Sequence, residues 1–397
     1  MKATVDASSL ARMLRGLKLG DARIKLEKGK KKEDVVMVTI CAQNNRLRVQ
    51  LETFDTVLTG YDRAKECWDS ELARYTVTAE IYAQVAEEGA YRLSFAAAKK
   101  VAKFCTGGDV ELDAAGIRMA ITQGKRKSAV AVESAEMVGF PEIGPGVTVP
   151  RGALCGVIGS HAAPEDTRNC LHQWAAVEAK VTGTTVSWTD GVQMFWQTLD
   201  PDLPGDRILV PLFAIKCLEA LKSAEDAVEC SSTGIQCGGG CVTYLEQAPS
   251  YYPNTLDVVQ QAGVVSGYTE VKTTCEDIRA MLKRLSSCMH DEVVLSATED
   301  RLHMLAYDNR NEHAREKRTC WELCPRAETW VDAAVERPLG AVGLNAARLK
   351  RSIGSYSGGL TLRVLDGDSP VIFDIENSGI RTVLMPLTPS FNRTTID

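Results

Sequence analysis

The stretch Ile208-Leu209-Val210-Pro211, which continues as LFAIKCLEALK to Lys222, decides the fold. Its first three residues are an apolar run typical of a strand. Pro211 suits the first turn of a helix, because its missing N–H would have no partner there in any case. After it, four apolar residues at three- and four-residue steps share one helix face: Ala214, Ile215, Leu218 and Leu221. The stretch therefore predicts a short strand that leads directly into an amphipathic helix.

The same pattern of a strand followed by a short helix occurs at five other places in the chain. They are Val5 with 8–17, 91–95 with 96–104, 147–150 with 152–161, 271–273 with 275–285, and 342–344 with 345–353. A two-turn helix cannot bury its apolar stripe alone, so each copy must pack on a sheet. Six copies make an internal repeat. We expect an α+β fold of three repeated domains, each with two units of strand, helix and further strands.

Two polar stretches predict where these domains end. The first, 139–146, is rich in glycine and proline, and the second, 247–263, follows the fourth copy of the repeat. Such stretches are typical of linkers. The expected domains are therefore 1–145, 146–263 and 264–397, the last with a short C-terminal tail, 389–397.

Composition predicts a cytoplasmic protein with no membrane segment. The chain has 397 residues, of which 45% are hydrophobic, and its N-terminus MKATVDASSL is polar where a signal peptide would be apolar. No apolar run approaches the roughly 18 residues of a membrane span. The 13 cysteines are an odd number scattered over the chain, which favours reduced core thiols over a disulfide framework.

Charge is distributed unevenly, although the net charge of −6 would by itself argue against a nucleic-acid partner. The six helices carry only three acidic residues: Glu219, Glu276 and Asp277. They carry fifteen basic residues: Arg12, Arg15, Lys18, Lys99, Lys100, Lys103, Arg151, Lys216, Lys222, Arg279, Lys283, Arg284, Arg348, Lys350 and Arg351. Lysine-rich faces that only keep a helix soluble are the alternative explanation. The excess of basic residues recurs on the helices of the repeat, which favours a surface that binds a polyanion.

Motifs for catalysis or cofactor binding are not found in the sequence. It has no GxxxxGK[ST], no GxGxxG after a strand and no HExxH. Cys237 with Cys241 and Cys320 with Cys324 could supply four thiolates to zinc, but their spacing fits buried strand cysteines better. We therefore expect no cofactor, no metal site and no catalytic residue.

Five short segments, in order along the chain, resemble the bacterial sliding clamp, the β subunit of the replicative DNA polymerase. They are 124–128 running to Phe140-Pro141, Thr189-Asp190-Gly191 with 208–211, Tyr252-Pro253, Gly343-Leu344-Asn345, and 383–387. The resemblance covers all three expected domains and identifies a divergent member, with a longer 61–89 region, and with Asn169 and Cys170 where the family has tyrosines.

The resemblance implies a non-catalytic processivity factor. In this family two subunits join head to tail as a homodimer, and the ring of six domains encircles double-stranded DNA. The replicative polymerase, the clamp loader and other clients bind through short linear peptides. A DNA-bound repair or nucleic-acid-processing factor on the same scaffold is the alternative. The residues expected to face DNA are Arg12, Arg15, Lys99, Lys103, Lys216, Arg279, Lys283, Arg284, Arg348, Lys350 and Arg351.

The resemblance also implies a pocket for client peptides between domains two and three. Apolar lining with a few polar groups suits a peptide anchored by one or two hydrophobic side chains. The residues that match the family's pocket are Arg168, Leu171, Thr189, Gly191, Met194, Pro253, Val258, Val383, Leu384, Met385, Pro386 and Leu387. The tail that follows contains one aromatic residue, Phe391, which could fold back into this pocket or have no role.

Overall fold

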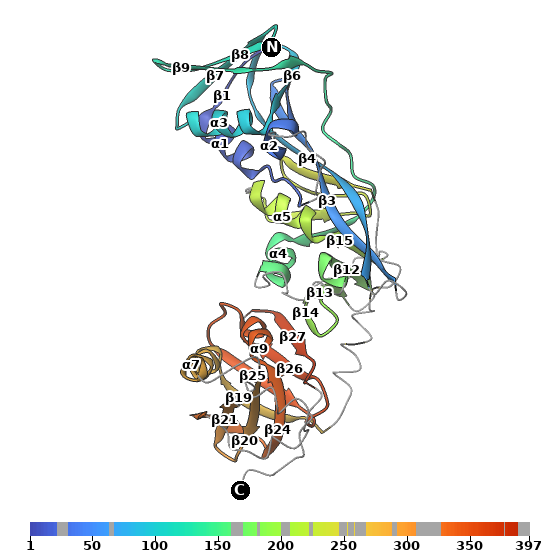
Figure 1. Cartoon of the computed structure of the whole chain (residues 1–397), viewed down its shortest axis with the longest axis vertical. Helices are drawn as coiled ribbons and strands as arrows, with labels where there is room; N and C mark the ends of the chain where they lie inside the picture. Colours follow the sequence, from blue (N-terminus) through green and yellow to red (C-terminus); the bar gives the residue numbers. More distant parts are fainter. Residues whose placement is uncertain are drawn as a thin grey trace. The chain divides into compact units, whose positions relative to one another are not determined.

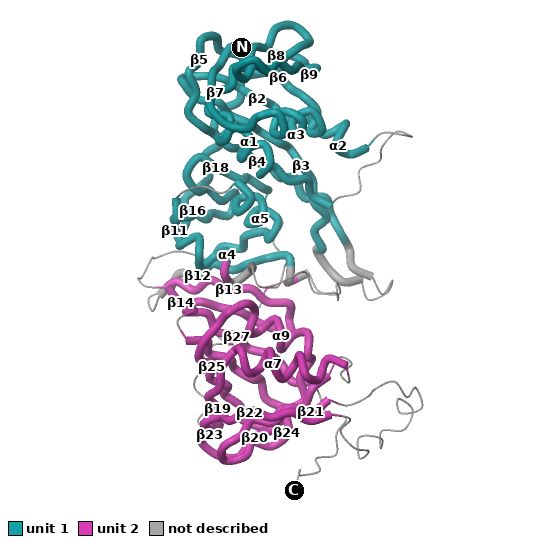
Figure 2. Tube along the Cα trace, turned by 90° about the vertical axis from the view of Figure 1, so that its left-hand side faces the viewer, with its two compact units in different colours: residues 1–155, 173–182, 202–251 teal, residues 156–172, 183–201, 252–397 magenta. Residues whose placement is uncertain are grey.

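The fold consists of two compact units in the computed structural model. Unit 1 comprises residues 1–155, 173–182 and 202–251, and unit 2 comprises 156–172, 183–201 and 252–397 (Figure 2). The residues that the structure describes are 1–21, 31–62, 67–159, 170–180, 183–199, 207–221, 225–245, 252, 258, 267–287, 292–306, 327–376 and 378–387.

Six repeats of strand, helix and three strands account for most of the chain (Figure 1). The first three repeats are β1 Lys2–Asp6, α1 Ala7–Gly16, β2 Met37–Gln43, β3 Arg46–Asp62 and β4 Cys67–Tyr82; β6 Gly89–Ser94, α3 Phe95–Phe104, β7 Asp109–Ala115, β8 Arg118–Gln123 and β9 Arg126–Ala131; and β11 Val147–Pro150, α4 Arg151–Gly159, β12 Trp174–Lys180, β13 Gly183–Thr189 and β14 Gln193–Leu199.

The last three repeats follow the same order. They are β15 Ile208–Pro211, α5 Leu212–Leu221, β16 Ala227–Cys230, β17 Gly234–Cys237 and β18 Gly240–Tyr244; β19 Thr269–Thr274, α7 Cys275–Leu285, β20 Glu292–Ala297, β21 Arg301–Ala306 and β22 Ala327–Asp332; and β24 Leu339–Asn345, α9 Ala346–Ile353, β25 Gly359–Val364, β26 Val371–Ile375 and β27 Ile380–Leu384. Five short elements lie between repeats or within them: α2 Lys32–Val35, β5 Gln84–Glu87, β10 Glu133–Ser134, the 3-10 turn Cys170–Gln173 and β23 Ala334–Val335.

All six predicted helices are present, so the predicted repeat is confirmed. The largest difference is α4, which begins at Arg151 and ends at Gly159, where the sequence predicted 152–161. Polar residues cap the N-termini of four helices, because the first N–H groups of a helix have no backbone partner. These caps are Asp6, Ser94, Thr274 and Asn345.

Unit 1 contains two antiparallel sheets and a further pair formed by β12 and β15. One sheet has the order β5-β1-β7-β8-β9, and the other the order β10-β6-β2-β3-β4-β18-β17-β16-β11. The pairing of β4 with β18 joins the first repeat to the fourth. Helix α1 packs against both α3 and α5. Strands β3 and β4 form a long hairpin, and β4 lies within the 61–89 region.

Unit 2 has the same construction. Strands β13, β14, β27, β26, β25, β19 and β23 follow one another in one sheet, and β22, β21, β20 and β24 form another. The apolar stripes of α7 and α9 are buried in a common core with residues of both sheets. The buried stripe of α7 includes Ile278, Met281, Leu282 and Leu285, which follow one another at three-, one- and three-residue steps. None of the helices that the structure describes is long and apolar enough to cross a membrane.

Candidate functional site

The turn between β13 and β14 is held in one conformation by its own side chains. Thr189 Oγ1 donates to the carbonyl of Gln193 (2.8 Å) and accepts from the N–H of Gly191 (3.0 Å). Asp190 Oδ1 accepts from the N–H groups of Val192 (3.0 Å) and Gln193 (2.8 Å). Gly191 adopts φ = 85°, which glycine tolerates without strain. Asp-Gly is a common pair in the short turns of β-hairpins, which agrees with the position of these two residues.

A buried ion pair fixes this turn to helix α9. Arg348 Nη1 lies 2.6 Å from Asp190 Oδ2, and the two side chains are only 16% and 3% exposed. Gln193 adds two hydrogen bonds, because its Nε2 donates to the carbonyl of Arg348 (3.0 Å) and to Ser352 Oγ (2.6 Å). The turn, the first residue of β14 and α9 therefore form one polar assembly.

Several residues of the predicted peptide pocket lie together at this turn. Strand β14 pairs with β27, and the N–H of Met385 donates to the carbonyl of Val192 (2.9 Å). Met194 and Val383 share a buried apolar cluster, and Val258 packs against it. Met385 is 43% exposed, and Pro386 and Leu387 are half-buried beside it. The end of β27 and the turn therefore present apolar side chains around an ordered backbone.

The remaining pocket residues lie elsewhere or outside the described residues. Leu171 is buried, and Leu384 points into the main core of unit 2. Arg168, Pro253 and the tail 388–397 lie outside the described residues. The Leu384 side chain is therefore part of the core, and only its backbone could contribute to the predicted pocket.

Four further residues adjoin this site, and the sequence did not predict them. Trp196 and Ile372 are buried in the cluster with Val383, and Tyr268 packs against it. Burial, and to a lesser degree Asp366, raises the pKa of the Tyr268 phenol, so this group stays neutral. Val192 is 39% exposed in the turn itself. No local signal marks these residues, because the pairing of β14 with β27 joins segments almost two hundred residues apart.

The basic residues of the helices are mostly exposed. Among the predicted DNA contacts, the exposed ones are Arg12, Arg15, Lys99, Lys103, Lys216, Lys283, Arg284 and Lys350. Three others, Arg279, Arg348 and Arg351, are half-buried. Lys18 and Lys100 are also exposed, and Lys222 lies outside the described residues.

Several of these cations already have partners within the protein. Arg15 donates to the carbonyl of Ala102 (3.0 Å), and Lys99 pairs with Glu33 (2.6 Å). Arg279 donates to the carbonyl of Tyr356 (2.6 Å), while Arg284 donates to Thr329 Oγ1 (3.2 Å). The half-buried Arg348 is held by Asp190. Its guanidinium therefore positions the turn, a role that the sequence did not predict.

The cysteines considered for zinc are buried core residues where the structure describes them. Cys237 Sγ donates to the carbonyl of Glu225 (3.3 Å). Burial raises the pKa of the Cys241 thiol to about 12, which keeps it protonated. A thiol must lose its proton to bind zinc. Cys320 and Cys324 lie outside the described residues. Among the described residues, no group of three His, Cys, Asp or Glu side chains could hold a metal ion.

Comparison with known proteins gives matches at the level of structure. No protein-family model matches the chain, and no curated protein sequence matches it. Among solved structures, the Helicobacter pylori β clamp bound to a DNA ligase peptide is 17% identical with a TM-score of 0.67, and the match covers 98% of this chain and 100% of that one.

Two further solved structures match over the whole length. The Pseudomonas aeruginosa DNA polymerase III β subunit bound to griselimycin is 14% identical with a TM-score of 0.72, covering 98% of this chain and 100% of that one. The Thermotoga maritima β subunit is 15% identical with a TM-score of 0.69, covering 98% of this chain and 99% of that one. Together with the six repeats, these matches show that the chain has the fold of the bacterial β sliding clamps.

Proposed function

We propose that this protein is a sliding clamp, a non-catalytic processivity factor that encircles duplex DNA and holds a replicative polymerase and other clients on it. The observation that carries the proposal is the repetition of basic residues on all six helices of an acidic protein with a clamp fold. Exposed cations of α1, α3, α5, α7 and α9 would neutralise phosphates. Contacts to phosphates alone carry no sequence information, so such a ring could slide. This role would place the protein in the cytoplasm with the DNA.

Two edges of the described sheets support a closed homodimer. Strand β9 is an edge of the five-stranded sheet of unit 1, and β22 is an edge of the four-stranded sheet of unit 2. Free edges tend to pair with another strand. Their charges are complementary, since β9 exposes Arg126 and Lys127 whereas β22 exposes Glu328 and Asp332. Head-to-tail pairing of β9 with β22 of a second copy, repeated by symmetry, would close a ring.

The site at the β13–β14 turn would serve the clients. An ordered turn and an exposed Met385 flank the cluster of Met194 and Val383, which suits a short peptide with an aliphatic anchor. One of the structural neighbours, the Helicobacter pylori clamp, is bound to a DNA ligase peptide. Arg168 and Pro253 complete the proposed pocket on the resemblance alone.

A comparison of circular with linear DNA tests whether the protein encircles the duplex. The protein, loaded by a clamp loader onto a nicked circular duplex, should elute with the DNA at moderate salt during gel filtration. Cutting the circle once should release it, because a ring slides off an end. Equal retention on the circular and the linear form would mean ordinary surface binding and would contradict the proposal.

A second experiment tests the client site. A fluorescent peptide that contains glutamine followed by hydrophobic residues should bind the wild-type protein. The double substitution Met385→Ser and Leu387→Ser should abolish the binding, because both aliphatic walls are removed. The dimer mass should not change, because neither residue lies on β9 or β22. Peptide binding at wild-type strength by this variant would contradict the assignment.

A further inference from the structure

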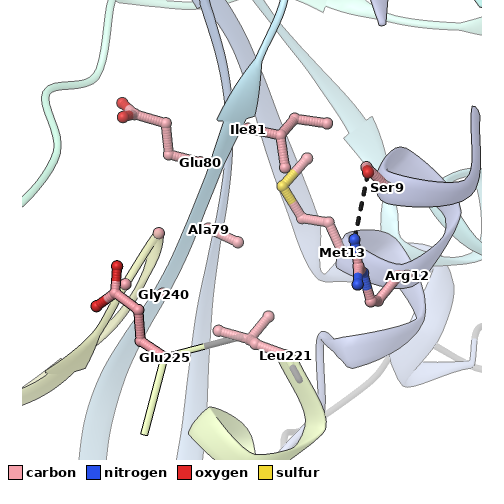
Figure 3. A pocket seen from close by; sticks show the side chains of 11 residues that line it. Ser9, Arg12, Met13, Ala79, Glu80, Ile81, Leu221, Glu225 and Gly240 are labelled. Carbon is pink, nitrogen blue, oxygen red and sulfur yellow. Dashed lines mark hydrogen bonds between the residues drawn. The ribbon is translucent and has the colours of Figure 1, made fainter. Parts of the chain in front are cut away.

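A cavity lies within unit 1, where β4 pairs with β18 (Figure 3). Its volume is about 260 Å³. Helix α1, the end of β4, the end of α5 and the turn between β17 and β18 line it. The lining residues are Ser9, Arg12, Met13, Ala79, Glu80, Ile81, Leu221, Glu225 and Gly238 to Gly240.

The backbone around this cavity repeats the backbone around the β13–β14 turn. Gly240 opens β18 opposite Ala79 of β4, and the N–H of Glu80 donates to the carbonyl of Gly239 (2.7 Å). In unit 2, Gln193 opens β14 opposite Leu384 of β27, and the N–H of Met385 donates to the carbonyl of Val192 (2.9 Å). In each case the last strand of one repeat pairs with the last strand of another.

The helices correspond as well. Helix α1 belongs to the repeat that ends with β4, and α9 belongs to the repeat that ends with β27. The two helices can be aligned at their N-caps, Asp6 and Asn345. Ser9 and Arg348 are then each the third residue after the cap, and Met13 and Ser352 are each the seventh. Gly240 takes the place of Gln193.

These replacements explain why there is a cavity in unit 1. In unit 2 the side chains of Gln193 and Arg348 fill the space between turn and helix and bond to Asp190, Ser352 and the α9 backbone. In unit 1, glycine and serine at the two positions are too short to fill it. The long hydrogen-bonded side chains are therefore replaced by open volume with an apolar wall.

The charged residues around the cavity indicate which kind of ligand it could bind. Met13, Ile81 and Leu221 form an apolar centre, with Ser9 and Arg12 on one side and two carboxylates on the other (Figure 3). Arg48 and Arg46 already pair with Glu80. Across the described part of the chain, the exposed Arg12 guanidinium bonds only to the uncharged Ser9 hydroxyl (3.2 Å). Among the described residues, Arg12 thus forms no salt bridge with a carboxylate, and Glu225 lies on the opposite side of the apolar centre.

We propose that this cavity is a second peptide-binding site, for a segment with an aliphatic side chain beside a carboxylate. The aliphatic group fills the space above Met13 and Leu221, and the carboxylate pairs with Arg12, whose planar fork suits it. A volume of about 260 Å³ admits one large side chain and its adjoining backbone, and not a folded domain. The inference does not depend on ring closure or on DNA binding.

The test uses the capped tetrapeptide acetyl-Gly-Leu-Asp-Gly-amide and the ¹³C-methyl resonance of Met13. In the wild-type protein, the Met13 methyl resonance should shift as the peptide is added, and the shift should reach a plateau at high peptide concentration. Gly240→Gln restores the side chain found in unit 2 and should weaken the binding at least about tenfold, since it displaces an aliphatic contact. The new Cβ would meet only mobile ends nearby, the Leu221 and Leu218 Cδ1 atoms at 3.0 and 3.5 Å, besides the Cys237 carbonyl at 3.5 Å. Gly107→Gln, in an open position, is the matched control and should bind as the wild type does.

A second variant examines the charge and needs no repacking. Arg12→Gln should bind the Asp peptide and the matching Asn peptide equally, whereas the wild type should prefer the Asp peptide. The proposal is overturned if the wild type shows no saturable shift, if Gly240→Gln binds as tightly as Gly107→Gln, or if the wild type does not distinguish the two peptides.

Discussion

At the scale of single residues, Arg348 shows how a basic residue on a predicted DNA-facing helix can serve the protein itself. Its guanidinium is bound to the buried Asp190 carboxylate, so Arg348→Ala would leave that carboxylate without its cation. Breaking a buried pair from one side costs about 3 kcal/mol. We expect the free energy of unfolding in urea to fall by about that amount, and the affinity for a client peptide to fall with it.

Lys350 is the matched control, because it lies on the same helix and is exposed. Lys350→Ala should change the free energy of unfolding by no more than about 0.5 kcal/mol. A decrease in Arg348→Ala as small as that in Lys350→Ala would mean that the Asp190 carboxylate is satisfied without Arg348.

Asp6 gives a prediction for pH. The Ser9 hydroxyl and then the Ser9 N–H bind the carboxylate and hold the pKa of Asp6 below its ordinary value. A carboxyl with a depressed pKa in the folded state stabilises the protein above its unfolded pKa, and this stability is lost as the pH falls through the folded pKa. Asp6→Ala should therefore cost about 1 kcal/mol at pH 7, and the difference from wild type should shrink below about pH 4. Denaturant unfolding across this range measures it. Asp6→Asn keeps a helix cap but removes the titrating carboxyl group. If the free energies of unfolding of the wild type and Asp6→Asn differed by the same amount at every pH, this account would be refuted.

At the scale of elements, the sequence predicted the helices well and their partners poorly. The six short helices follow from apolar spacing and from caps such as Thr274 and Asn345, which are local signals. The Asp190-Gly191 hairpin is local in the same way. The pairing of β14 with β27 and that of β4 with β18 are not, so the cavity in unit 1 and the ion pair of Arg348 could not be foreseen from sequence alone.

Exposed lysines on the helices give the prediction at this scale. Lys283 on α7 and Lys350 on α9 are exposed. Reversing both charges, Lys283→Glu with Lys350→Glu, should weaken binding to duplex DNA and lower the slope of log K against log salt by about 2, one unit for each phosphate that is no longer neutralised.

Lys272→Glu is the control, because Lys272 is exposed on strand β19 and not on a helix. Its slope should equal that of the wild type. If the strand variant and the helix variant were weakened equally, the effect would come from overall charge and not from a DNA-facing helix surface.

At the scale of the whole molecule, the three predicted domains remain a proposal. The repeats come in the expected order, yet the sheet that contains β4 and β18 runs past the boundary proposed at 145, so that residues on both sides share one compact unit. A polar linker in the sequence marks a change of element, and it gives no information about strand pairing across it.

In the proposed dimer the edge strands β9 and β22 would pair, and Trp330 is the residue on which to test this assembly. It is 51% exposed on the edge strand β22, where an aromatic side chain would be buried if β9 of a second copy paired there. Interface tryptophans contribute about 2 kcal/mol or more, so Trp330→Glu should raise the dimer dissociation constant at least about thirtyfold. Sedimentation should then give the monomer mass of 43.2 kDa at concentrations where the wild type sediments at twice that mass. Leu72→Glu alters another exposed apolar residue, outside both edges, and should leave the wild-type mass. A wild-type protein that is monomeric, or a Trp330→Glu variant that dimerises as well as Leu72→Glu, would remove β22 from the seam.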